Sequence, residues 1–304
     1  LMGSEFVALG LTPVLIAAFA SMACALPGNF LILRKQALIG DAISHVILPG
    51  IVVAYLLTGK LSTWPMMIGA AGAAVTSVIL IETIRRLGRI EYGAAMGVVF
   101  TAMFAAGVLL LEQTDTSRMH LDVEHALFGN LEMLIWLQSD GWASVFRFED
   151  LVQLPPQFFR MFIALFIISM FTYVFWRPLV LISFDEAYAR TIGFQAMMIG
   201  FFLVVFAAVA AVAAFEAVGS IIVIAMILCP PATARLLTND IKMQVFLSLF
   251  LAISATLTGY IIAGYVPLWL GFSNTFSAAG TIATLSGLLL ALSAIYGRHR
   301  KRLT

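Results

Sequence analysis

The chain has 304 residues, of which 62% are hydrophobic and only 11% are charged, and its formal net charge is +1. Soluble domains carry about 25% charged residues, so this composition excludes a soluble protein and indicates a polytopic membrane protein. The small net charge gives no indication of nucleic-acid binding. The two cysteines, Cys24 and Cys229, form no CxxC metal motif and provide no disulfide framework.

The chain begins with LMGSEF, residues 1–6, which matches a remnant of two adjacent cloning sites. Residues 7–304 are expected to form a single transmembrane domain of α-helices. A spanning helix needs about 20 apolar residues. The double proline at 230–231 predicts that the span 219–237 is broken or re-entrant. The chain then has eight spans instead of nine. The candidate spans are 9–32, 37–58, 65–87, 93–112, 159–182, 196–216, 219–237, 243–265 and 275–296.

Basic residues orient these spans. If nine spans alternate, one side of the membrane receives nearly all of the arginines and lysines that flank them, and this side is cytoplasmic by the positive-inside rule. The N-terminus is then outside and the C-terminus inside. The residues concerned are Arg34, Lys35, Arg85, Arg86, Arg89, Arg177, Arg190, Arg235, Lys242, Arg298, Arg300, Lys301 and Arg302.

The span 37–58 contains one carboxylate, Asp41, and one imidazole, His45. Four residues apart on a helix, both side chains leave the same face. An aspartate in hydrocarbon costs about 2.5–3.5 kcal/mol even on lenient scales. Carboxylate and imidazole together can ligate a divalent metal ion. From spacing alone the pair could equally relay protons or hydrogen-bond to neighbouring helices.

The polar connection 113–158 is the longest in the chain, and we expect it to be an outer loop with one or two short amphipathic helices at the membrane surface. His120 and His125 lie in it, and their spacing favours a docking surface over a second metal site. Glu216, at the outer end of a span, is expected to shape the outer mouth of the pathway or to contact a delivery protein.

On the cytoplasmic side, residues 183–193 predict a short amphipathic helix that Gly193 can end. Such a helix can seat in a groove of a partner subunit. The residues predicted to make this contact are Phe184, Asp185, Glu186, Ala187, Arg190 and Gly193.

Three segments carry a family resemblance: LRKQALIGDAISHVILPGIVVAYLL (33–57), FEAVGSIIVIAMILCPPATARLLT (215–238) and PLVLISFDEAYARTIGF (178–194). They are similar to the R–x5–GDALSHAVLPG, VG…PAATA and FDPExAxxxG motifs of the membrane permeases of bacterial ABC importers for zinc, manganese and iron. The FEAVG segment resembles the manganese/iron branch. Glu186 and the Pro-Pro at 230–231 depart from the usual residues, but neither departure touches the expected ligands.

The resemblance implies a type II ABC importer-like permease in the bacterial cytoplasmic membrane. It also implies a second permease subunit, two cytoplasmic ATPase subunits and an extracytoplasmic metal-binding protein. Asp41 and His45 of two subunits would then provide four ligands for a transported Mn²⁺, Zn²⁺ or Fe²⁺, with no permanently bound cofactor. The sequence contains no GxxxxGK[ST] phosphate loop, so ATP hydrolysis is expected in a partner.

Three alternatives remain open at this stage. An ATP-independent, ion-coupled carrier would use Asp41 and His45 as a proton relay. A membrane scaffold would transport nothing, which leaves the intramembrane carboxylate without a role. A permease for chelated iron or cobalamin would need a wide pore, which the charged pair argues against.

Overall fold

The computed structural model describes residues 6–36, 38–59, 63–113, 131–136, 141–271 and 275–297, and regular structure within them is entirely helical. Eight helices are long and apolar enough to cross a membrane. The elements in chain order are η1 (Val7–Leu11), α2 (Thr12–Leu33), α3 (Ile39–Thr58), α4 (Thr63–Gly88), α5 (Tyr92–Gln113), η3 (Leu131–Met133), η4 (Trp142–Phe146), α7 (Phe148–Leu151), α8 (Pro156–Val174), α9 (Trp176–Phe184), α10 (Glu186–Thr191), α11 (Ala196–Leu237), α12 (Ile241–Trp269) and α13 (Ala278–Tyr296).

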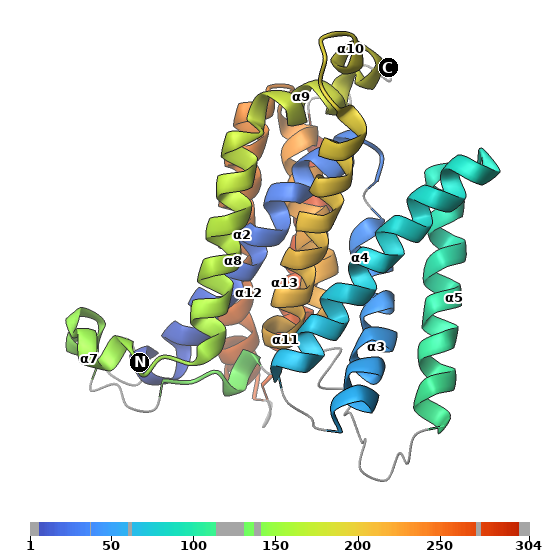
Figure 1. Ribbon diagram of the computed structural model, residues 1–304. Helices are drawn as coiled ribbons and strands as arrows, with labels where there is room; N and C mark the ends of the chain where they lie inside the picture. The colour runs from blue at the N-terminus through green and yellow to red at the C-terminus, as the bar shows by residue number, and fades with distance from the viewer. Residues whose placement is uncertain are drawn as a thin grey trace.

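The helices form two groups (Figure 1). The larger group contains α2, α8, α11, α12 and α13, and its centre is the contact between α2 and α11. The smaller group consists of α3, α4 and α5, where α3 and α4 connect it to α11. The short helices α9 and α10 lie at one end of the molecule, while η1 and α7 lie at the other.

The 42-residue helix α11 contains two of the predicted spans. A straight helix of this length would be about 63 Å long, twice the thickness of the hydrocarbon core, which is about 30 Å. The backbone leaves the helical conformation at Gly219, where φ is 79° and ψ is 167°. The predicted boundary between 196–216 and 219–237 therefore coincides with a sharp break. The break expected at the double proline 230–231 was wrong, because both prolines lie inside the helix that follows Gly219.

Contacts on either side of Gly219 show that the chain reverses there. Gly200, near the start of α11, lies against Arg34 at the end of α2, and Leu236 lies against Gly297 at the end of α13. Asn29, near the end of α2, is hydrogen-bonded to Gln244, which follows α11 by a few residues. Both ends of α11 thus lie at the same end of the bundle. Among the eight candidate helices, seven cross once and α11 crosses twice, which makes nine passes.

The reversal at Gly219 predicts a stability effect. Its φ and ψ fall in a region that only glycine populates readily, so Gly219→Ala should lower the free energy of unfolding by about 1–3 kcal/mol. Thermal unfolding of the purified protein in detergent would measure this. Gly287→Ala in α13 is the control, because a Cβ there meets nothing within 4 Å. It should be neutral or stabilising by up to about 1 kcal/mol. Equal effects of the two substitutions would contradict the prediction.

The end that carries α9 and α10 also carries several of the basic residues predicted to be cytoplasmic, whereas Arg298, Arg300, Lys301 and Arg302 lie outside the described residues. Arg34, Arg85, Arg86 and Arg190 line one small hollow there, together with Glu82 and Glu186. The opposite end, predicted to be the outer one, contains η3, η4 and α7, which are short helices within the predicted loop 113–158. Residues 1–5 of the predicted cloning remnant lie outside the described residues.

Candidate metal pathway and coupling segment

Asp41 and His45 lie one turn apart on α3. The Asp41 carboxylate is in the first turn of the helix, where the positive end of the helix dipole favours a negative charge. Its Oδ1 atom is 3.6 Å from His45 Nε2. The side chains are 48% and 44% exposed, although the same helix buries ten other residues. The pair therefore faces outward from this chain.

The depth of the pair, which the sequence alone does not decide, follows from a contact between α3 and α11. A Cβ at Gly40 would lie 3.0 Å from the Cδ1 atom of Ile227. Ile227 is roughly midway between the reversal at Gly219 and the inner end of α11 at Leu237, about 15 Å from the latter along the helix. Asp41 thus lies far from the inner end of the bundle when measured along the helices, although its side chain is exposed on one side.

Two aromatic residues of α5 flank the His45 imidazole. Its ring centroid is 5.6 Å from that of Phe100, nearly parallel, and 5.6 Å from that of Phe104, nearly perpendicular. Such contacts favour a fixed ring orientation. The sequence gives no signal for them, because they depend on how α5 packs against α3.

Within the described residues, no group of three or more histidine, cysteine, aspartate or glutamate side chains could hold a metal ion. Ser44, next to His45, donates its hydroxyl hydrogen bond to the Gly40 carbonyl oxygen of its own helix. In the part of the chain that the structure describes, Asp41 and His45 are therefore a pair without a third ligand.

The predicted helix in 183–193 is present as α10. The Asp185 side chain accepts a hydrogen bond from the Tyr188 backbone N–H and begins the helix. Glu186 and Arg190 form an ion pair of 2.6 Å along it. At its end, the N–H groups of Gly193 and Phe194 donate to the Arg190 and Ala189 carbonyls, a Schellman motif with Gly193 at φ 93°. These residues are thus used to build the helix.

The exposed apolar surface of this segment comes from other residues. Phe184, Tyr188 and Ile192 are 58%, 55% and 50% exposed. Tyr188 and Ile192 lie about one turn apart on α10 and its C-terminal cap, whereas Phe184 ends α9, before the extended backbone of Asp185. Ala187 is also exposed, whereas Ala189 is buried. Exposed large apolar side chains that lie outside the candidate spans, as Phe184, Tyr188 and Ile192 do, are typical of a protein contact surface.

At the outer end, Glu216 has a partner that the sequence does not reveal. The Arg160 guanidinium, at the start of α8, donates to its carboxylate at 2.6 Å. The side chains are 18% and 31% exposed. Glu216 therefore ties α11 to α8 close to the reversal. His120 and His125 lie outside the described residues, and the docking surface expected there stays a prediction.

Loss of this ion pair should destabilise the protein. Glu216→Gln leaves the Arg160 guanidinium, from which water is largely excluded, without its charged acceptor. A hydrogen bond to a charged group contributes about 1.5–3 kcal/mol, and we expect thermal unfolding in detergent to show a loss of this order. The control is Glu82→Gln, because Glu82 pairs with Arg85 and Arg86 along its own helix, and each pair of this kind is worth about 0.5 kcal/mol or less. A smaller loss for Glu216→Gln than for Glu82→Gln would contradict the prediction.

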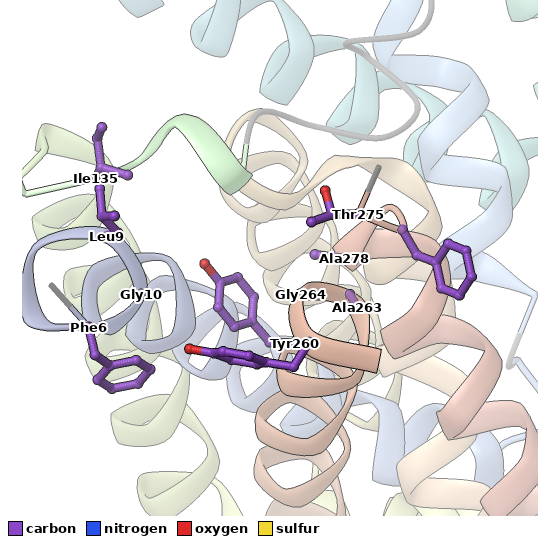
Figure 2. Close-up of a pocket in the computed structure, with 11 residues that line it drawn as sticks. Phe6, Leu9, Gly10, Ile135, Tyr260, Ala263, Gly264, Thr275 and Ala278 are labelled. Atoms are coloured by element: carbon purple, nitrogen blue, oxygen red, sulfur yellow. The ribbon is translucent and has the colours of Figure 1, made fainter. Parts of the chain in front are cut away.

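A large hollow opens at the outer end, between η1, the later part of α12 and the start of α13 (Figure 2). Its lining is largely apolar, with the hydroxyls of Tyr260, Tyr265 and Thr275 as polar groups. None of the described residues that line it carries a carboxylate, an imidazole or a thiol. This hollow is therefore separate from Asp41 and His45 and unsuited to a metal ion.

The sequence of the chain matches the model of the ABC 3 transport family over residues 9–296, which is nearly its whole length. The chain belongs to this family. It is a multi-pass membrane permease of an ABC importer, not itself an enzyme, as the sequence predicted. Family membership implies ATPase and binding-protein partners, so the alternatives of an ATP-independent carrier and a scaffold are excluded.

Relatives of the permease support this assignment. It is 33% identical over 276 residues to the manganese transport system membrane protein MntD of Bacillus subtilis (strain 168), covering 90% of this chain and 88% of that protein. It is 34% identical over 283 residues to the zinc transport system membrane protein TroD of Treponema pallidum (strain Nichols), covering 93% and 72%. A chain of the solved structure of PsaBC from Streptococcus pneumoniae in complex with Fab matches with a TM-score of 0.73 and 25% identity, covering 96% and 93%.

Proposed function

We propose that the permease imports Mn²⁺, Zn²⁺ or Fe²⁺ through a pore between two permease subunits, and that Asp41 and His45 of each subunit contact the ion in transit. The observation that carries this proposal is the half-exposed pair on α3, far from the inner end of the bundle and without a third ligand among the described residues. The relatives named for manganese and zinc transport support the choice of ion.

A two-fold pore explains why the pair is incomplete. Two carboxylates and two imidazoles suit tetrahedral zinc, or octahedral manganese or iron with added water. A site that uses ligands from two moving subunits can also release its ion when the subunits separate. Release matters because an ion pathway must bind strongly enough to admit the ion but weakly enough to let it leave.

In the same proposal, α9 and α10 dock on a cytoplasmic ATPase through Phe184, Tyr188 and Ile192. The outer end, including Glu216, receives the ion from the binding protein. ATP binding and hydrolysis in two ATPase subunits switch access to the ion from outside to inside. The second permease subunit is a copy of this chain or a close relative.

Competition among metal ions tests the proposal. The complex of permease, ATPase and binding protein is reconstituted in vesicles. ATP-dependent uptake of Mn²⁺, Zn²⁺ and Fe²⁺ is measured for each ion alone and with the other two as competitors. We expect ATP-dependent accumulation of at least one of these ions, and competition by the others according to their affinity. If none of the three accumulates above the level without ATP, the proposed substrate class is wrong.

A further inference from the structure

The side chain of Arg34, at the end of α2, is held by three elements at once. Its Nη1 atom donates to the Ile182 carbonyl oxygen of α9 at 3.3 Å, and its Nε atom donates to the Gln36 side chain at 3.2 Å. The guanidinium also packs against Gly200 of α11, in a space that a side chain at position 200 would occupy. A Cβ at Gly200 would lie only 2.8 Å from Arg34 Nη2.

A charge interaction with Glu186 of α10 also holds Arg34. Burial lowers the pKa of the Arg34 guanidinium, and the Glu186 carboxylate of α10 is the group that most strongly opposes this shift. Glu82 and Tyr92 act in the same direction, and Arg85 acts against them. Arg34 and Glu186 line the same hollow at the cytoplasmic end. Both α9 and α10 therefore hold Arg34, one through its backbone and the other through its charge.

The turn that follows Arg34 is short and closed by backbone hydrogen bonds. Lys35 N–H donates to the Ile32 carbonyl at 3.0 Å and Gln36 N–H to the Leu31 carbonyl at 2.8 Å, with Lys35 at φ 57°. This is a Schellman motif built without glycine. The N–H of Ile39, the first residue of α3, donates to the Gln36 carbonyl. Backbone hydrogen bonds thus connect Arg34 closely to the start of α3, where Asp41 lies in the first turn.

We propose that Arg34 is a positioning residue that transmits movement of α9 and α10 to α3, and so to Asp41 and His45. This inference rests on the proposed function and adds the mechanical connection between the ATPase contact and the ion pathway. Neither Arg34 nor Gly200 contacts the ion. Their role is to make the coupling segment and α3 move as one unit.

The test is the number of Mn²⁺ ions imported per ATP hydrolysed by the reconstituted complex, or of Zn²⁺ ions if the competition assay identifies zinc. Arg34→Lys keeps the charge but cannot donate in two directions from a planar group. Gly200→Ala forces the guanidinium from this space on α11 without changing any charge. We expect each variant to lower the ratio about tenfold, within the usual range of coupling between sites. Equilibrium metal binding and basal ATP hydrolysis should be unchanged.

Gly287→Ala is the matched control for Gly200→Ala, since a Cβ at Gly287 meets nothing within 4 Å. An unchanged ratio in both Arg34→Lys and Gly200→Ala would overturn the inference. So would a fall in metal binding that matches the fall in uptake, because Arg34 would then act on the ion pathway itself. Failure of the wild-type complex to import any of the three ions would refute the proposed function, which is a separate result.

Discussion

Replacing Asp41 or His45 with alanine is expected to abolish metal uptake by the reconstituted importer. Asp41→Ala removes the charge that attracts the cation, and His45→Ala removes the nitrogen ligand held against Phe100 and Phe104. Changes to groups that only orient a ligand already cost about 10–100-fold in metal affinity, so loss of a ligand should reduce ATP-dependent uptake by more than about 100-fold. In a two-fold pore each substitution also removes two ligands at once.

Ser44→Ala provides the control for these two variants. Ser44 lies on the same turn of α3, but its hydroxyl donates only to the carbonyl oxygen of Gly40. We expect its uptake to stay within about twofold of wild type, since a local side chain–backbone hydrogen bond contributes little to a helix interior. Co-purification with the ATPase shows whether each variant assembles. Normal uptake by both Asp41→Ala and His45→Ala would refute the assignment of the pair.

Features determined by local sequence were predictable. The length of apolar segments indicated the passes, and the boundary between 196–216 and 219–237 falls at the reversal within α11. The double proline at 230–231 pointed to the wrong place for the break, because the helix runs through it. The helix α10 was predictable from local signals. Asp185 at its start and Gly193 at its end stabilise the helix through hydrogen bonds to residues three to five positions away.

Contacts between distant segments were not predictable from one sequence. Arg160 and Glu216 are 56 residues apart, and Arg34 and Ile182 are 148 residues apart. Nothing in the local pattern of either segment indicates these partners, which depend on how whole helices pack. Asp41 and His45 were identified because their cost in a membrane is visible in the sequence. Their aromatic neighbours Phe100 and Phe104 were not, because apolar residues in a span are ordinary.

The exposed apolar residues of α9 and α10 lead to the second large effect. Tyr188→Asp places a charge between Phe184 and Ile192 in the chain, where the tyrosine is 55% exposed in the isolated chain. Tyrosines at the centre of interfaces commonly contribute about 2 kcal/mol or more, so we expect ATPase binding to weaken by roughly 30-fold or more. Co-purification and titration of the ATPase against the permease in detergent would measure this, and ATP-dependent uptake should fall in parallel.

Tyr296→Asp is the matched control for this experiment. Tyr296 ends α13 at the cytoplasmic end of the bundle and is 79% exposed, but it does not belong to the segment of α9 and α10 that is proposed to bind the ATPase. The same substitution there should leave ATPase binding unchanged. Tyr188→Asp should also retain equilibrium metal binding, because Asp41 and His45 lie far from the cytoplasmic end of the bundle. The two variants should therefore have opposite defects: Tyr188→Asp should bind metal but not the ATPase, and Asp41→Ala should bind the ATPase but not metal. Wild-type ATPase affinity in Tyr188→Asp would show that the ATPase docks elsewhere.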